Sequence, residues 1–261
     1  MNRDARLSRI LDLLAEQTQV SVEEVVTGLA VSPATARRDL DLLAEQQLLT
    51  RTRGGAVAHA AIYDLPLRYR HQHHSEQKLA IARAATAKVQ RGDVIGICGG
   101  TTTSAIAEAL MMRPDLLEPS DVPNLTVVTI GVNIAAQLAT RPQFRTVITG
   151  GIVNPRSYEA IGPYAEAVLS NIALDIAFAG TDGIDPVHGA TSQDEREASV
   201  TKLMMSRAAE SILVTDSSKF DRRAFAAMGG PSDYSAVITD RGLTDDQYER
   251  YTAAGYRIEV V

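Results

Sequence analysis

Apolar side chains recur at helical spacing near the start of the chain. Between Asp4 and Gln17 the apolar positions are one, three or four residues apart, which places them on one face of a helix. They are Leu7, Ile10, Leu11 and Leu14. The stretch therefore predicts a first amphipathic helix.

Two further helices are predicted from their N-terminal caps. Ser21 is followed three residues later by Glu24, which forms a capping-box pattern before a short apolar stripe. Ser32 is a second N-cap, and Pro33 suits the first helical position because its missing N–H has no partner there. This third helix is expected to run to about Gln46, with two adjacent arginines on its outer face.

Residues 48–57 predict a small hairpin after the third helix. Their alternating pattern is interrupted by Gly54 and Gly55, which tolerate positive φ, and it leaves Arg51 and Arg53 on the polar side. Three short helices followed by such a wing are typical of a winged helix-turn-helix. The sequence thus predicts this module for residues 1–57.

In such modules the start of the last helix reaches base edges and wing arginines approach phosphates. Arginine suits both tasks because its planar fork pairs with guanine or with a phosphate. On spacing alone, a solvated helix face on a protein-docking module stays an equal alternative. The candidate DNA-binding residues are Ser32, Pro33, Ala34, Thr35, Arg37, Arg38, Arg51 and Arg53.

The rest of the chain alternates short β-branched runs with amphipathic segments. Such alternation predicts right-handed βαβ units and a mostly parallel sheet covered on both faces. Ligands in these sheets bind beyond the carboxyl ends of the strands. The predicted strands are 94–98, 125–129, 146–149, 176–179, 212–215, 236–239 and 257–260, and the predicted helices are 103–111, 133–138, 162–169, 195–209 and 245–253.

The segment after the first of these strands has the chemistry of a phosphate cradle. Gly99 and Gly100 permit close backbone approach, and Thr101, Thr102 and Thr103 offer hydroxyl and N–H groups at a helix start, which favours anions. It is neither a Walker motif nor a dinucleotide fingerprint. A tight strand-to-helix turn with a threonine cap is the structural alternative.

Two later strand ends carry polar groups of other kinds. Asp182 and Asp185 follow the strand at 176–179 and could hold sugar hydroxyls, or could be turn formers beside Gly183. Lys219 follows the strand at 212–215 and could neutralise a phosphate. Hydroxyls, carboxylates and an ammonium together suit a phosphorylated sugar or polyol.

Residues 58–74 form a connector that contains His71, His73 and His74. Their spacing does not suit one helix face, and neither a Cys nor a carboxylate motif accompanies them, so a solvated linker is favoured over a metal site. No metal and no cofactor is expected. The domain beyond the linker is expected to span 75–261.

Charge and composition refine this picture. The chain has 26 Lys and Arg against 32 Asp and Glu, a single Cys and no apolar run of the roughly 18 residues that a membrane span needs. A soluble cytoplasmic protein in a reducing compartment is expected. The acidity lies in residues 91–261, whereas residues 1–90 have twelve basic and ten acidic residues. The net charge therefore does not exclude DNA binding by the first domain.

The stretch VSPATARRDLDLLAEQQLLTRTRGGAV resembles the DNA-binding signature of the DeoR family of bacterial transcriptional regulators. It departs from that signature at Ala36, Gln47 and Arg53. The segments GGTTT, AFAGTDGI and DSSKF resemble the effector domain of the same family, with departures at Cys98 and over 129–131. The resemblance implies an effector domain similar to ribose-5-phosphate isomerase and the coenzyme A transferase-like fold.

That resemblance also implies roles for individual residues. Gly99, Gly100, Thr101, Thr102 and Thr103 would surround a phosphate. Asp182 and Gly183 would lie near the sugar, with Lys219 at the rim. Cys98, at the end of a buried strand, is expected to be an inert core thiol.

Two function classes follow. In the first, the protein is a transcriptional regulator, expected to be a repressor of a carbohydrate operon, with operator DNA and a phosphosugar as partners. In the second, the body is a sugar-phosphate isomerase with an accessory head. The first is favoured because Pro186, Val187 and His188 stand where such an isomerase has a Lys-Gly-Gly-Gly segment, and no catalytic residue is assigned. Pairing of chains into a dimer or tetramer is expected, because one head contacts few base pairs.

Overall fold

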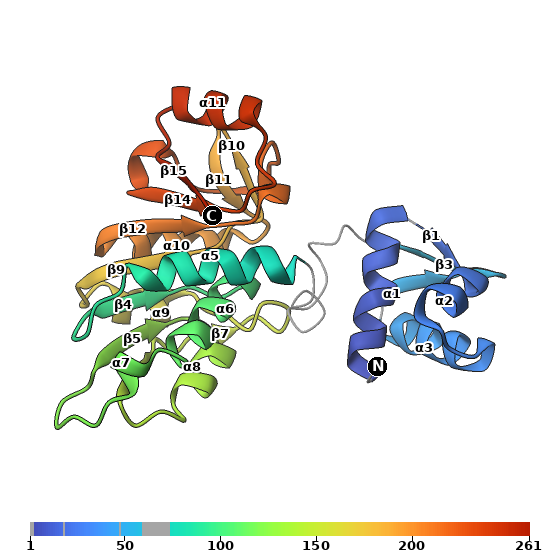
Figure 1. Cartoon of the computed structure of the whole chain (residues 1–261), viewed down its shortest axis with the longest axis horizontal. Helices are drawn as coiled ribbons and strands as arrows, with labels where there is room; N and C mark the ends of the chain where they lie inside the picture. Colours follow the sequence, from blue (N-terminus) through green and yellow to red (C-terminus); the bar gives the residue numbers. More distant parts are fainter. Residues whose placement is uncertain (1–2, 18, 47, 59–73) are drawn as a thin grey trace. The chain divides into compact units, whose positions relative to one another are not determined.

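The computed structural model describes residues 3–17, 19–46, 48–58 and 74–261. Contacts divide the chain into two units, 1–73 and 74–261, which are described separately (Figure 1).

The first unit is a three-helix module with a small antiparallel sheet. Ser21 caps α2 through a capping box with Glu24, and Ser32 caps α3 with Pro33 in its first turn. The sheet has the order β1-β3-β2. These elements confirm the predicted winged helix-turn-helix, to which the structure adds β1. Their bounds are α1 Arg3–Gln17, β1 Gln19–Ser21, α2 Val22–Leu29, α3 Pro33–Glu45, β2 Leu49–Arg51 and β3 Gly55–Ala58.

The core of the first unit consists of the predicted helix faces. Leu7, Ile10, Leu40 and Leu43 are among its buried side chains. Gly55 is required for space rather than for positive φ, because a Cβ atom there would overlap the Val20 carbonyl oxygen. The close approach of β3 to β1 therefore explains that glycine.

The second unit is built on a seven-stranded sheet of order β15-β14-β12-β9-β4-β5-β6, in which every neighbouring pair is parallel. All seven predicted strands lie in it, so the predicted parallel α/β fold is confirmed. The strand bounds are β4 Val94–Ile97, β5 Leu125–Thr129, β6 Phe144–Ile148, β9 Leu174–Ala179, β12 Ala208–Val214, β14 Ala236–Thr239 and β15 Ile258–Val260.

Helices cover both faces of the sheet. One apolar cluster contains Ile81 of α5 and Ile106 of α6, and the other contains Ala165 of α9 and Met204 of α10. Figure 1 shows α5 and α6 lying across one face of the strands. The helix bounds are α5 Ser75–Ala87, α6 Thr101–Leu110, α7 Pro114–Leu117, α8 Val132–Leu138, α9 Pro163–Leu169, α10 Glu195–Ser206 and α11 Asp245–Ala253, with 3-10 turns η2 Ser217–Lys219 and η3 Pro231–Asp233.

The chain order of the strands places a switch point between β4 and β9. From β4 the chain winds outward through β5 and β6, then returns to the other side of β4 and continues through β9, β12, β14 and β15. In doubly wound sheets, ligands bind outside the carboxyl ends of the strands at such a point.

Short antiparallel pieces were not predicted. A three-stranded sheet, β10-β11-β13, and a two-stranded one, β7-β8, are separate from the main sheet. In the chain, β7 and β8 follow β6, and β10 and β11 follow β9. The predicted helix over 195–209 also overruns, because Ala208 already pairs with Leu174 of β9. The bounds of the added strands are β7 Ile152–Val153, β8 Ala160–Ile161, β10 Gly183–Asp185, β11 Gly189–Ser192 and β13 Ala226–Gly229.

Candidate DNA-binding and effector sites

The N-terminus of α3 is capped by a local hydrogen bond from the backbone to the Ser32 side chain. The Ser32 hydroxyl accepts from the Thr35 N–H at 3.1 Å, and its oxygen lies 2.9 Å from that of the Thr35 hydroxyl. Ser32, Pro33 and Ala34 are exposed, and Thr35 is partly exposed. The first turn of α3 thus presents these four candidates at the surface.

Residues 37–39 of α3 comprise an exposed pair of arginines and a buried carboxylate. The side chains of Arg37 and Arg38 are exposed and have no hydrogen bond or ion pair among the residues that the structure describes. Asp39 is only 2% exposed and accepts hydrogen bonds from Nε of Arg6 and, at 3.1 Å, from its Nη2. This pairing joins α1 to α3 and raises the pKa of Arg6.

The two wing arginines differ from each other. Arg53 is exposed and unpaired within the described part of the chain. Arg51 donates from Nε to Asp41 at 2.7 Å, and its Nη1 donates to the Gly55 carbonyl oxygen. Arg51 therefore connects the wing to α3, a role that spacing alone did not reveal.

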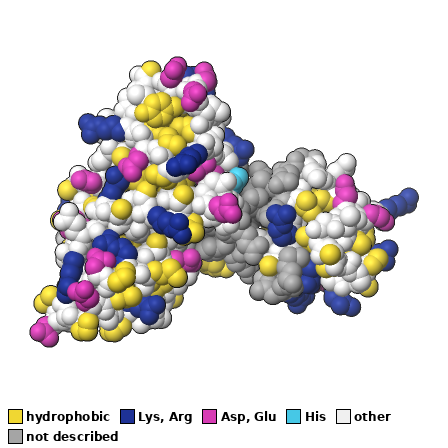
Figure 2. Space-filling view, viewed as in Figure 1, with side chains coloured by type: hydrophobic (Ala, Val, Ile, Leu, Met, Phe, Trp, Pro, Cys, Tyr) yellow, Lys and Arg dark blue, Asp and Glu magenta, His cyan; other side chains and the backbone are white. Residues whose placement is uncertain are grey.

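The two units can also be compared by the charged side chains on their surfaces. Figure 2 shows Lys and Arg side chains projecting from the first unit, with some Asp and Glu side chains among them, and both signs of charge interspersed over the second. The exposed arginines Arg37, Arg38 and Arg53 place positive charge on the outer surface of α3 and the wing.

The three predicted effector segments follow three neighbouring strands. Ile97 of β4 pairs with Phe178 of β9, and Ala179 of β9 pairs with Leu213 of β12. The segments that carry Gly99–Thr103, Asp182 and Lys219 therefore leave the same edge of one sheet side by side.

The segment after β4 turns tightly into α6. Gly100 is the N-cap with φ of 119°, which only glycine adopts readily. The hydroxyls of Thr103 and Ser104 both donate to its carbonyl oxygen, at 3.1 and 2.7 Å. Thr103 is fully buried, whereas Thr101 is partly exposed and Thr102 is 8% exposed. The N–H groups of the first turn, rather than every threonine hydroxyl, are the donors that this turn presents.

Asp182 and Gly183 have different surroundings. The Asp182 carboxylate accepts from the Gln193 N–H at 3.0 Å and from the Ser192 hydroxyl at 3.4 Å. Gly183 is buried in β10, where a Cβ atom would come within 2.6 Å of the Arg222 carbonyl oxygen. Gly183 thus serves close packing, while Asp182 is partly exposed.

A buried charged group beside Lys219 was missed at the level of sequence. Asp216 is 3% exposed and accepts from the Ser218 hydroxyl and, at 3.1 Å, from the Ser218 N–H. Burial alone would raise its pKa, but the Ser218 hydrogen bond and the charges of Lys219, His74 and Lys78 lower it. A carboxylate thus stays ionised among basic groups.

Lys78 is the second missed residue. It lies on α5 and is 6% exposed. Its position three and four residues before Ile81 and Ala82 puts it on the buried stripe of that helix, and a lysine on an apolar face is the signal that could have identified it. His74 immediately precedes α5, whereas His71 and His73 lie outside the described residues.

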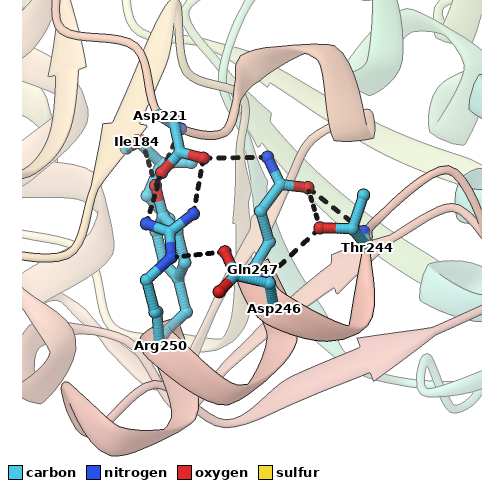
Figure 3. Close-up of polar contacts among 7 residues, drawn as sticks. Ile184, Asp221, Thr244, Asp246, Gln247 and Arg250 are labelled. Atoms are coloured by element: carbon cyan, nitrogen blue, oxygen red, sulfur yellow. Dashed lines mark hydrogen bonds and ion pairs between the residues drawn. The ribbon is translucent and has the colours of Figure 1, made fainter.

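Helix α11 anchors the segment that follows Lys219 (Figure 3). The buried Tyr251 hydroxyl donates to the Ile184 carbonyl oxygen at 2.6 Å and accepts from the Asp221 N–H at 2.9 Å. Arg250 donates twice to the Asp221 carboxylate, at 2.9 and 2.8 Å, and Gln247 donates to it at 3.0 Å. The hairpin after Asp182 and the turn after Lys219 are therefore tied to one helix.

Cys98 is a core residue. It is 1% exposed, and its Sγ lies 3.5 Å from Sδ of Met204. Burial, together with the nearby Glu159 carboxylate, raises the pKa of the thiol. The thiol form is therefore favoured, as an inert role requires.

Over the described residues, no helix is long and apolar enough to span a membrane. Nor does any group of three or more His, Cys, Asp or Glu side chains within those ranges have the arrangement of a metal site.

Both units match family models. The DeoR-like helix-turn-helix domain matches residues 6–61, and the DeoR C terminal sensor domain matches residues 73–241. The glycerol-3-phosphate regulon repressor of Escherichia coli (strain K12) is 34% identical over 240 residues, 92% of each chain. The HTH-type transcriptional regulator GlpR of Haloferax volcanii is 30% identical over 254 residues, 97% of this chain and 96% of the relative.

Two solved structures are more distant. A D-ribose-5-phosphate isomerase in complex with phospho-erythronic acid matches with a TM-score of 0.41 and 20% identity, over 56% of this chain and 54% of the other. The full-length sorbitol operon regulator SorC from Klebsiella pneumoniae matches with a TM-score of 0.34 and 14% identity, over 83% and 89% of the two chains.

Proposed function

This chain belongs to the DeoR family of transcriptional regulators, and on that premise we propose that it represses a carbohydrate-metabolism operon. A phosphorylated sugar bound by the second unit releases the operator DNA. One observation carries the proposal: Gly99–Thr103, Asp182 and Lys219 follow neighbouring strands of one sheet in a chain that begins with a winged helix-turn-helix.

The start of α3 is the proposed reading element. Arg37 and Arg38 are exposed there, and an arginine fork pairs with guanine O6 and N7 or with a phosphate. Arg53 approaches a phosphate from the wing, while Arg51 supports the wing through Asp41. The full proposed contact set is Ser32, Pro33, Ala34, Thr35, Arg37, Arg38, Arg51 and Arg53.

The start of α6 is the proposed phosphate site. The first N–H groups of a helix have no partner within the helix and carry partial positive charge, so they favour an anion. Lys78 and Lys219, which face Asp216, supply positive charge at the adjoining strand ends. Asp182 accepts a hydrogen bond from a sugar hydroxyl. The proposed effector-binding set is Gly99, Gly100, Thr101, Thr102, Thr103, Asp182, Gly183 and Lys219, with Lys78 added.

Operator binding requires more than one chain. Because residues 1–90 have twelve basic and ten acidic residues, one head neutralises few DNA phosphates. A homo-oligomer, dimer or tetramer, would place two heads on repeated half-sites. The reading head covers 1–57 and the connector 58–74 in this scheme, and the protein acts in the cytoplasm.

The second unit is proposed to bind a sugar phosphate without converting it. Between Asp185 and Gly189 the chain has Pro186, Val187 and His188, which form the tip of the β10-β11 hairpin. This tip has no lysine to assist an isomerisation. Interconversion of ribose 5-phosphate and ribulose 5-phosphate by the purified protein would contradict this.

A gel-shift assay on the DNA upstream of the gene tests the proposed function. We expect the full chain to retard this fragment and a member of a panel of phosphosugars to release it, with the matching unphosphorylated sugars as controls. Failure to bind the fragment, or release by unphosphorylated sugars alone, would contradict the proposal.

A further inference from the structure

The two edges of the seven-stranded sheet differ in how they are protected. At one edge, β15 has three residues, and its Glu259 pairs with Lys88 at 2.7 Å. A short, charged strand is one of the means by which proteins prevent a sheet edge from pairing with another chain. At the other edge, β6 has five residues, of which only Arg145 is charged. The edge at β6 is therefore less protected than the edge at β15.

The edge at β6 also carries exposed apolar side chains. Ile148, at the end of β6, is 45% exposed, and Ile152 and Val153 of β7 are 61% and 46% exposed. Because β7 pairs with β8 and α9 begins two residues after β8, the 68% exposed Tyr164 of α9 lies close to the same hairpin. We call these four side chains the β6 edge surface.

This surface is poor in charge. Residues 146–155 contain no charged residue, in a chain of which 22% of the residues are charged. Single exposed apolar side chains are ordinary, but a cluster of them without charge is typical of the central part of a protein–protein interface. The β6 edge surface therefore has the composition of a contact with another protein chain.

The charge pattern of β6 is compatible with a second copy of the chain. In a two-fold interface each patch meets its own copy, so a patch that is rich in one charge repels itself. When two β6 strands pair antiparallel about an axis between residues 146 and 148, Arg145 lies opposite one of the uncharged residues 147–151 of the other copy. The backbone groups at the two edges then pair with each other without opposing charges.

We propose that two copies of the chain associate through the β6 edge surface, with β6 of one copy running antiparallel to β6 of the other. The inference deepens the proposed pairing of chains on the operator and rests on it. The sheets of two sensing units continue into each other across the two-fold axis, and the exposed apolar side chains leave water.

Sedimentation velocity of the full chain tests this with the wild type, Ile148→Lys and a matched control, Val260→Lys. Val260 is apolar and 42% exposed, and it lies on β15 at the opposite edge. We expect Ile148→Lys to raise the dissociation constant of the association by about 100-fold or more, because the new charge enters a two-fold interface twice. Val260→Lys should leave it unchanged, and circular dichroism checks that each variant is folded.

Cross-linking provides a second measurement that does not need a lysine at the interface. The single native cysteine, Cys98, is buried, so Ile148→Cys and Val260→Cys each add one exposed thiol. A short bismaleimide should join two copies of Ile148→Cys into a covalent dimer and should leave Val260→Cys as single chains.

A wild-type chain that stays monomeric would overturn the inference, as would equal association and equal cross-linking of the variants at positions 148 and 260. A gel shift on the upstream fragment separates this from the proposed function. Retardation by a wild type whose association does not depend on Ile148 would overturn only the inference. Association through the β6 edge surface without retardation would contradict only the proposed function.

Discussion

The charged residues singled out at the two proposed sites differ in exposure. In the first, Arg37, Arg38 and Arg53 are exposed and have no partner among the residues described. In the second, Lys78 and Asp216 are each less than a tenth exposed. DNA is larger than the head and meets charges that point outward, whereas a small phosphate ester is distinguished from others only by groups that surround it. Exposure of charge thus separates the proposed DNA-reading residues from the buried charges beside the proposed effector site.

The contacts that support the two sites also differ in kind. The reading helix is held by a buried ion pair, Arg6 with Asp39, that joins α1 to α3. The sensing loops are held by the neutral Tyr251 hydroxyl, together with the partly exposed Asp221–Arg250 ion pair. Substitutions at these supports should therefore affect one unit and leave the other intact.

The largest expected effect is on the head. Asp39→Ala leaves Arg6 without its buried partner, which should lower the free energy of unfolding of the head by about 3 kcal/mol. Urea unfolding followed by circular dichroism measures this. The urea transition that tyrosine fluorescence reports should be the same in Asp39→Ala as in the wild type, because residues 1–57 contain no tyrosine.

Asp41→Ala is the matched control for Asp39→Ala. Its side chain is 59% exposed and pairs with Arg51, so its removal should cost less than about 1 kcal/mol. Equal losses in the two variants would show that burial of the Arg6 pair does not support α3.

The next effect is on the sensing unit. Tyr251→Phe removes the hydroxyl that serves both the Ile184 carbonyl and the Asp221 N–H, and it should lower the free energy of unfolding of that unit by about 2 kcal/mol. Tyrosine fluorescence during urea unfolding reports it. Tyr164→Phe, at a residue that is 68% exposed, should have no effect, and a similar loss in both variants would contradict this role.

The smallest effect is a pH dependence of the same region. The hydrogen bonds from Arg250, and then that from Gln247, lower the pKa of Asp221 to about 2 from an ordinary value of 3.8. Because the folded state holds this proton less tightly, the stabilisation is present above about pH 4 and is lost as the pH falls through 2.

The Asp221–Arg250 pair is partly exposed, with side chains 39% and 42% exposed, so solvent screening limits its contribution to under about 1 kcal/mol. Urea unfolding of the sensing unit at pH 5 and pH 3 should show a slightly larger loss for the wild type than for Asp221→Asn. The same loss in both proteins would exclude this carboxylate as the source.

The features that sequence predicted are those encoded locally. The Ser21 and Ser32 caps, the seven parallel strands and the edge that carries Gly99–Thr103 and Lys219 all follow from spacing or from residues within a few positions. Thr129 to Gly131 drew attention only as a departure from a family pattern.

The features that it missed depend on distant partners. Arg6 and Asp39 are 33 residues apart, and nothing near Asp39 distinguishes it from the exposed Asp41. Lys78 meets Asp216 only because α5 and β12 reach the same edge of the sheet, and Glu159 meets Gly99 only through the fold of β7 and β8. Such pairs require the tertiary structure.

The separation of reading from sensing is the central claim, and one titration tests it most directly. Fluorescence anisotropy of labelled operator DNA is measured with and without the releasing phosphosugar for the wild type, Arg38→Ala and the double variant Thr102→Val with Lys219→Ala. Arg38→Ala should lose about tenfold or more in operator affinity while still binding the phosphosugar. The double variant should bind operator as the wild type does but should not be released. Wild-type operator affinity in Arg38→Ala, or normal release of the double variant, would contradict the account.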